Sequence, residues 1–201
     1  RELHVAWVLE TRDLGLIPEQ YLRERAKPTS EYEYGQSAAF PVERVLETAL
    51  LMGGRNVDEL ILRLEDQEPA VRFWAANGLT NLGTEALPSQ EKLLHILNKD
   101  TVSEVRIAAA QALCKMDKPE PALPVLASFL KDERLYIRVA AANVVDRIGE
   151  QARPIQAEIL QALHRPWPEI NQGANFLPWL LQHTLRKMDT AGPQLQTTHL
   201  P

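Results

Sequence analysis

The sequence predicts an all-α fold, in which about four antiparallel helix pairs stack into a right-handed α-α superhelix behind an irregular N-terminal helical arm. The first observation is a block of nine residues at 71–79, which returns at 105–113 and again at 137–145. The second is an apolar helical pattern before each block, with Leu, Ile and Val spaced to line one helix face. Two helices per repeat, recurring at a fixed interval, are typical of a solenoid.

Each repeat carries the same polar and small residues at matching positions. An Asp stands six residues before the Arg of every block, so we expect a structural ladder of Asp66, Arg72, Asp100, Arg106, Asp132 and Arg138. The Asp would lie in the turn before the second helix, where it can accept hydrogen bonds from free N–H groups. The Arg would reach an Asp of its own or a neighbouring repeat. The paired alanines at 75–76, 109–110 and 141–142 would let two helices approach closely.

Flanking segments extend the predicted stack on both sides. Pro41 is expected to occupy the first position of a capping helix that stops at Gly53-Gly54. Pro154 would open a helix that runs to about Leu163, and residues 169–188 would form a last helix, kinked or divided at Pro178. The expected organisation is an arm at 1–40, a repeat domain at 41–188 and a polar tail at 189–201.

The arm contains no repeat. Residues 1–12 are helix-like, and Gly15 is expected to end that helix. Pro18 would start a short helix from residue 19 to about 26. Residues 27–40 are expected to form a loop.

The repeat blocks resemble the short bacterial form of HEAT repeats. The shared features are the Asp-x5-Arg spacing, the Val-Arg pair, the Ala-Ala step and a closing Leu-x-x-x-Gly, which runs here from Leu79 to Gly83. The second copy has Asp117 where Gly83 and Gly149 stand in the others, so its helix is expected to end differently.

A second resemblance covers the string from Trp7 to Glu19, Trp-Val-Leu-Glu-Thr-Arg-Asp-Leu-Gly-Leu-Ile-Pro-Glu. It is similar to a turn near the C-terminal end of the catalytic region in bacterial sulfatases, some of which continue into HEAT-like helices. The resemblance implies a fragment, the C-terminal appendage of a sulfatase, in a periplasmic or extracellular location. No catalytic role carries over, because Cys114 is followed by Lys-Met-Asp-Lys and not by the sulfatase Cys-x-Pro-x-Arg motif.

Composition argues against several other classes. The chain has 201 residues, 22 basic against 27 acidic, and no strongly basic segment, so we expect no nucleic-acid binding. No apolar run reaches the roughly 18–20 residues that span a bilayer. One cysteine and five scattered histidines, without a His-x3-His pair, predict no metal site and no cofactor. The acidic pairs near residues 65–68 and 132–133 fit turns and caps better than acid–base catalysis.

The second helices present a candidate partner-binding row. Residues at 73, 107 and 139, at 77, 111 and 143, and at 81, 115 and 147 are expected to lie off the core, where apolar and amide side chains suggest a covered surface. The candidate binding residues are Phe73, Trp74, Asn77, Gln111, Asn143 and Arg147. The alternative is that the cap helix or the tail covers them within the chain. Trp7, Trp167 and Trp179 could bind sugar or pack at the irregular ends.

The sequence therefore predicts a non-catalytic interaction or scaffold module with a protein partner, either the sulfatase domain of the same polypeptide or another subunit. A free-standing scaffold is one alternative. A HEAT-like enzyme such as a bilin lyase is another, which tetrapyrrole absorbance on mixing would test. A DNA glycosylase would need a basic groove, and the acidic charge of −5 opposes it.

Overall fold

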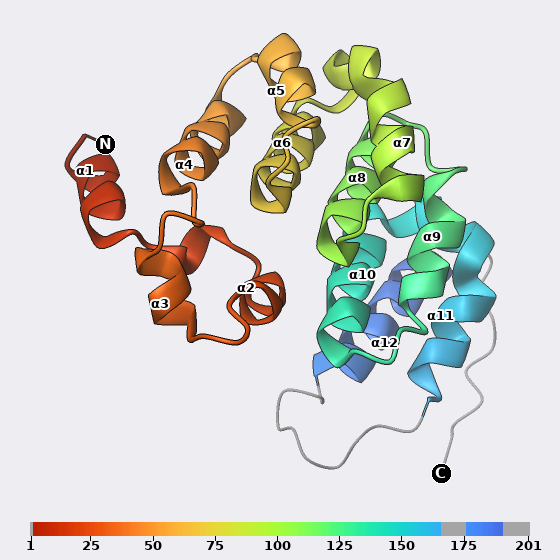
Figure 1. The fold of residues 1–201 in the computed structure, drawn as a ribbon. Helices are drawn as coiled ribbons and strands as arrows, with labels where there is room; N and C mark the ends of the chain where they lie inside the picture. Colours follow the sequence, from red (N-terminus) through yellow and green to blue (C-terminus); the bar gives the residue numbers. More distant parts are fainter. Residues whose placement is uncertain (1, 166–175, 191–201) are drawn as a thin grey trace. The chain divides into compact units, whose positions relative to one another are not determined.

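The computed structural model describes residues 2–165 and 176–190, and all of their regular structure is helical (Figure 1). The chain forms two compact units, Arg1–Lys118 and Pro119–Pro201. Each unit contains helix pairs whose two members pack against each other. The prediction of an all-α helical solenoid is confirmed.

Four such pairs are described, two in each unit. The first unit holds α5 (Val57–Arg63) with α6 (Pro69–Leu82) and α7 (Gln90–Lys99) with α8 (Ser103–Lys115). The second unit holds α9 (Ala122–Phe129) with α10 (Leu135–Ile148) and α11 (Gln156–Leu163) with α12 (Phe176–Thr190). The second helices of successive pairs also pack together, α6 on α8 in the first unit and α10 on α12 in the second.

Leucines, β-branched residues and alanines make the interior of the helix pairs. Val71, Val105 and Ile137 head the three blocks and are buried, as are the paired alanines that follow them. An alanine surface brings two helix axes close without a loss of helix propensity. In α6, Gly78 packs tightly on Leu60 of α5, because an added Cβ would lie 2.7 Å from a methyl group of Leu60.

The ends of the second helices depend on left-handed backbone. Gly83 after α6 has φ +56° and Gly149 after α10 has φ +55°, and each begins a 3₁₀ helix, η3 (Gly83–Ser89) and η4 (Gly149–Ile155). After α8, Asp117 also has a positive φ, +59°, but one residue, Met116, intervenes. Pro154 lies inside η4 and does not open α11, because the helix begins only after the 3₁₀ turns end.

The arm holds more helix than its sequence predicted. It consists of α1 (Glu2–Thr11), the 3₁₀ helix η1 (Leu14–Leu16), α2 (Glu19–Arg25) and α3 (Glu31–Gln36). The loop prediction for residues 27–40 was wrong, because Ser30 and Glu33 form a reciprocal capping box that starts α3. Gly15 does not end α1 either; the helix ends at Thr11, and Arg12 takes the left-handed conformation, with φ +52°.

The predicted capping helix is α4 (Val42–Leu50), which packs on α6 and continues as η2 (Leu51–Gly53). Pro41 precedes the helix as its N-cap and is not its first helical residue. Val42, Val45 and Leu46 bury the inner face of α4 in a cluster shared with the arm and the start of α6.

A buried polar contact joins the arm to the first repeat. The hydroxyl of Tyr21 on α2 donates to the carboxylate of Glu68 at 2.7 Å, and Glu68 is the N-cap of α6. Burial, followed by the hydrogen bond to Glu68, raises the pKa of Tyr21 far above its ordinary value. The phenol is therefore held as a donor, and the arm has a defined position on α6.

The predicted last helix is described only in part. Residues 169–175 and 191–201 of the predicted helix and tail lie outside the described residues. From Phe176 the helix is continuous to Thr190. Pro178 falls in its first turn, where backbone N–H groups have no partner within the helix, so the proline is tolerated there.

Candidate functional site

The three ladder aspartates have the same local geometry. Each accepts a hydrogen bond from the backbone N–H two residues ahead: Asp66 from Glu68 at 2.8 Å, Asp100 from Val102 at 2.9 Å and Asp132 from Arg134 at 2.8 Å. The acceptors fix the turn that leads into the second helix of each pair.

One arginine of the ladder joins two successive repeats. The guanidinium of Arg72 donates to both carboxylate oxygens of Asp100, at 2.7 and 3.0 Å. It also donates to the backbone carbonyl of Asp66 at 2.8 Å, in the turn of its own repeat. The carboxylate is only 3% exposed. A planar, bidentate pair of this kind fixes geometry as well as charge, so Arg72 ties the turn before α6 to the turn before α8.

The other two arginines of the ladder are Arg106 and Arg138. Arg106 donates from Nε to the carbonyl of Leu97 at 2.8 Å, at the end of the preceding helix. Arg138 is buried, and burial together with the charge of Arg165 lowers its pKa. Asp132 binds Arg134, and this hydrogen bond holds the pKa of Asp132 below its ordinary value.

Two of the predicted binding residues lie beside the arm. Trp74 is half-buried, and its indole N–H donates to the carbonyl of Leu16 at 2.6 Å. The ring of Phe73 meets Trp74 edge-on at 5.7 Å. The arm thus contacts Trp74 within the same chain, whereas the alternative to an external partner had named the cap helix or the tail.

The amide positions of the row fall into two groups. The side-chain amides of Asn77 and Asn143 are half-buried, and each donates to the carbonyl four residues back, at 2.9 and 3.0 Å. Gln111 is 8% exposed, and Ile107 above it is also buried, so the expectation that these two positions lie off the core was wrong. The tight α6–α8 packing that Ala108–Ala110 allow explains their burial. Arg147 is exposed.

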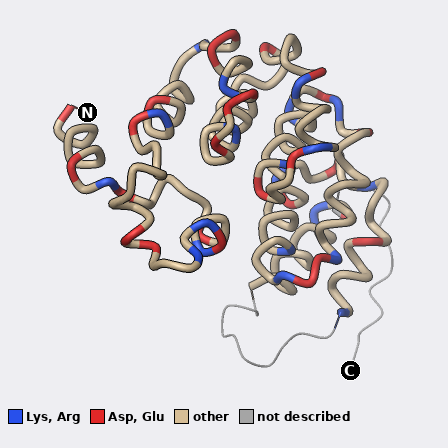
Figure 2. Tube along the Cα trace, viewed as in Figure 1, with Lys and Arg blue, Asp and Glu red and all other residues tan. Residues whose placement is uncertain are grey.

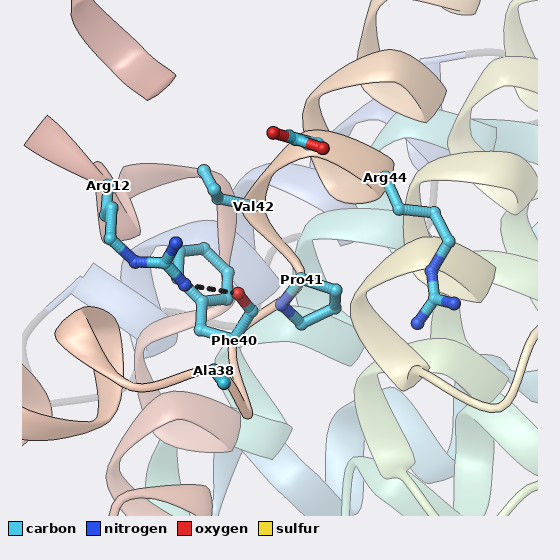
Figure 3. A pocket seen from close by; sticks show the side chains of 7 residues that line it. Arg12, Ala38, Phe40, Pro41, Val42 and Arg44 are labelled. Atoms are coloured by element: carbon cyan, nitrogen blue, oxygen red, sulfur yellow. Dashed lines mark hydrogen bonds between the residues drawn. The ribbon is translucent and has the colours of Figure 1, made fainter. Parts of the chain in front are cut away.

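The turn after α1 is organised by Arg12. Its Nε and Nη2 donate to the carbonyls of Gly35, Ser37 and Phe40 at 2.5–2.8 Å, and its charge lies 5.7 Å from the Phe40 ring centroid. Figure 3 shows this side chain across a pocket of about 310 Å³ from Arg44, with Phe40 and Pro41 between them. No spacing rule predicts these hydrogen bonds of Arg12, because the acceptors are backbone carbonyls more than 20 residues away.

A second pocket, of about 330 Å³, is also lined by Arg12 and lies between α1 and α3. It is lined by Trp7, Thr11, Arg12, Asp13, Leu14, Tyr32, Gly35 and Gln36. Trp7 is 51% exposed and Tyr32 74% exposed. Sequence analysis considered Trp7 but not Tyr32, because it expected a loop at residues 27–40. The helix α3, which places Tyr32 beside this pocket, was not predicted. A third pocket, of about 360 Å³, surrounds the Arg72–Asp100 pair and includes His95 and Lys99.

In the second unit, Asp146 fastens α12 to α10. Its carboxylate accepts hydrogen bonds from the hydroxyl of Thr184 at 3.1 Å and from the ammonium of Lys187 at 3.0 Å. The same carboxylate lies 2.9 Å from Nδ1 of His183. Burial would raise the pKa of Asp146, but the hydrogen bonds of Lys187, His183 and Thr184 outweigh it and hold the pKa below its ordinary value. Trp179 stacks on His183 at 5.4 Å and is half exposed. Trp167 lies outside the described residues.

Three further observations concern catalytic chemistry, metal binding and membrane insertion. The thiol of Cys114 is fully buried in α8. Within residues 2–165 and 176–190 the structure has no group of three or more His, Cys, Asp or Glu that could hold a metal ion. Among the same residues, no helix is both long and apolar enough to cross a bilayer.

Comparison with known proteins places the repeats in a family. The family model for HEAT repeats matches residues 49–114 and residues 90–174. No curated protein matches the chain closely enough to count as a relative. The two family matches overlap and together take in more than half of the chain, including every helix from α5 to α11. The chain therefore belongs to the HEAT-repeat family.

Proposed function

We propose that this chain is a non-catalytic interaction module in which Asn77 on α6 and Asn143 on α10 each contact a protein partner. HEAT repeats support a helical-repeat scaffold or interaction role. The observation that carries the finer proposal is the matched geometry of Asn77 and Asn143. Both amides donate to the carbonyl four residues back on their own helix, and both remain partly exposed.

That hydrogen bond orients each amide. A primary amide has two N–H donors and one acceptor oxygen, and one donor is used on the helix. The remaining groups can meet the N–H and C=O groups of a partner's backbone, which present the same donor and acceptor chemistry. Phe73 adds an apolar contact one turn before Asn77, since aromatic residues dominate the energetics of interfaces.

The experiment is site-specific photo-cross-linking at Asn81, which is exposed one turn beyond Asn77. After a cross-linked partner is identified, its affinity is measured for the wild type and for Asn77→Ala, Asn143→Ala and Phe73→Ala. We expect each substitution to weaken partner binding while the thermal unfolding temperature stays near the wild-type value.

Asn98→Ala is the matched control. Asn98 makes the same bond to the carbonyl four residues back, at 2.8 Å, but it lies on α7, a first helix outside the row. If the row variants lower stability and leave partner binding unchanged, the row is a structural contact within the chain and the proposal is wrong.

A narrower proposal is that the module is the C-terminal appendage of a sulfatase, with the sulfatase domain as its partner. Its support is the resemblance of residues 7–19; the comparisons with known proteins add none. The structure gives three of those residues local roles: Thr11 bonds the carbonyl of Trp7, Arg12 clamps the loop before α4, and Asp13 accepts from Gly15. The coding sequence upstream of Arg1 tests the proposal, because a sulfatase would carry a Cys/Ser-x-Pro-x-Arg motif there and a different domain would rule it out.

A further inference from the structure

The pocket of about 310 Å³ at the start of α4 has charged groups on its own lining. The charged lining residues are Arg12, Glu43 and Arg44, and the others are Ala38, Phe40, Pro41 and Val42. Ala38, Glu43 and Arg44 are exposed, and Arg12 is half-buried. The lining therefore carries two positive charges and one negative charge. It does not include Asn77 or Asn143, so what it binds is independent of the proposed function.

The guanidinium of Arg12 is only partly used by the chain. Its Nε and Nη2 donate to backbone carbonyls in the loop before α4, whereas its Nη1 has no hydrogen-bond partner among the described residues. Nη1 is not one of the fully buried atoms that lack a partner, so its two N–H groups reach solvent. Figure 3 shows the guanidinium between Phe40 and Val42, with one nitrogen bonded to the Phe40 carbonyl and the other facing Val42.

This donor is in position before any ligand arrives. Three hydrogen bonds to backbone carbonyls hold the guanidinium of Arg12. Its own backbone has φ +52°, a conformation that residues other than glycine adopt at a cost and that persists only where the surroundings fix it. A ligand of Nη1 therefore has to order little of the protein, which favours binding.

Arg44 supplies the second guanidinium. Its Nε lies 3.3 Å from a carboxylate oxygen of Asp66, and its side chain is 47% exposed. Asp66 does not line the pocket, but it offsets part of the charge of Arg44. In the part of the chain that the structure describes, the Nη groups of Arg44 have no partner, so they can donate to a carboxylate. Arg12 is the principal donor and Arg44 the weaker one.

The balance of charge favours one carboxylate. Two lining arginines face one lining glutamate, so the pocket accommodates one further negative charge. A polyanion would also meet the net charge of −5 on the chain, which repels it. Figure 2 shows Lys and Arg positions interspersed with Asp and Glu positions along the described helices, which gives a polyanion no continuous basic track. We propose that this pocket is a docking site for the carboxylate of a glutamate or aspartate side chain from a partner protein.

The test uses a rhodamine-labelled synthetic peptide of alternating glutamate and glycine, and the same peptide with glutamine in place of every glutamate. Fluorescence anisotropy with the full chain should show binding of the glutamate peptide alone. Raising the salt from about 0.05 M to about 0.5 M should weaken it, because Arg44 is exposed. Arg44→Gln should raise the dissociation constant about threefold, and Glu43→Gln, which removes the opposing charge, should lower it by a similar factor.

Ala38→Glu tests the pocket without removing the hydrogen bonds of Arg12. A glutamate at this exposed lining position supplies a competing carboxylate within the chain, and it should raise the dissociation constant about tenfold. Ala39→Glu is the matched control, because Ala39 is exposed and adjacent but does not line the pocket. Arg55→Gln is the control for Arg44→Gln, since Arg55 is exposed and lies 3.3 Å from its partner Glu85, outside the pocket.

Circular dichroism verifies that each variant is folded. The proposal is overturned if the wild type does not bind the glutamate peptide or binds the glutamine peptide equally well. Equal losses for Ala38→Glu and Ala39→Glu, or for Arg44→Gln and Arg55→Gln, would also overturn it, because the attraction would then come from the general charge of the surface. Displacement of the peptide by inorganic phosphate at a lower concentration than by acetate would mean that the pocket is a phosphate site instead.

Discussion

The guanidinium of Arg72 and the carboxylate of Asp100 form two parallel hydrogen bonds that connect the first repeat to the second. Arg72→Ala would leave the buried carboxylate of Asp100 without these donors. Loss of one partner of a shielded pair typically costs about 3 kcal/mol, and we expect a decrease of that order in the free energy of unfolding of the first unit. Urea denaturation at neutral pH measures it.

The exposed pair of Asp132 and Arg134 provides a comparison. Arg134 is 42% exposed, and its contact with Asp132 lies within one turn. Solvent screens such a pair, so Arg134→Ala should cost at most about 1 kcal/mol. If Arg72→Ala and Arg134→Ala had equal effects, the inter-repeat contact would have no special importance for the stack.

Tyr21→Phe tests how the arm is attached. The change removes the hydroxyl that donates to Glu68 and leaves a buried carboxylate oxygen without it. We expect a loss of about 1–3 kcal/mol in the free energy of unfolding. Tyr32→Phe is the control, because Tyr32 is exposed and should tolerate the change. An unchanged stability for Tyr21→Phe would mean that the arm is held by its apolar contacts alone.

Gly83→Ala and Gly149→Ala test the helix ends. With φ near +55° and ψ near −120°, both glycines adopt a backbone conformation that an L side chain avoids, so each substitution should cost about 1–3 kcal/mol. No atom lies within 4 Å of a Cβ built on Gly149, so its cost would be conformational strain. A Cβ built on Gly53 also has no atom within 4 Å, and Gly53 does not have a positive φ. Gly53→Ala should therefore leave the free energy of unfolding nearly unchanged.

The helix ends also indicate what sequence could predict. Periodicity located the repeats, because the helical pattern and the Ala-Ala steps are local signals. The repeat alignment also places Asp117 at the position of Gly83. The structure has Asp117 in left-handed backbone there, but α8 ends one residue earlier than α6 does, with Met116 between the helix and Asp117. The helix α3 was missed although its capping box, Ser30 and Glu33, is a local signal.

The contacts of the site were less predictable than the helices. Whether Arg72 meets Asp66 or Asp100 depends on the spacing of two repeats, and the structure has the side chain of Arg72 on Asp100 and on the backbone of Asp66. Trp74 meets Leu16, which lies 58 residues earlier. No pattern within a repeat encodes such a contact, because it depends on how the arm folds back on α6.

Asp146→Asn tests the attachment of α12 and its dependence on pH. The pKa of Asp146 in the folded protein lies below its ordinary value of about 4, so on acidification the unfolded chain takes up the proton first. The stability that ionised Asp146 contributes is therefore complete above about pH 5 and is lost as the pH falls below about 4. At about pH 6 the variant should be less stable than the wild type by about 1–3 kcal/mol, the usual worth of hydrogen bonds to a charged group. At about pH 2.5 the difference should shrink, because the wild-type carboxyl is then increasingly protonated.

Urea denaturation at the two pH values gives both differences, and Glu133→Gln, an exposed position in the same unit, is the control. A difference that persists at the lower pH would show that Asp146 acts through its shape and neutral hydrogen bonds and not through its charge.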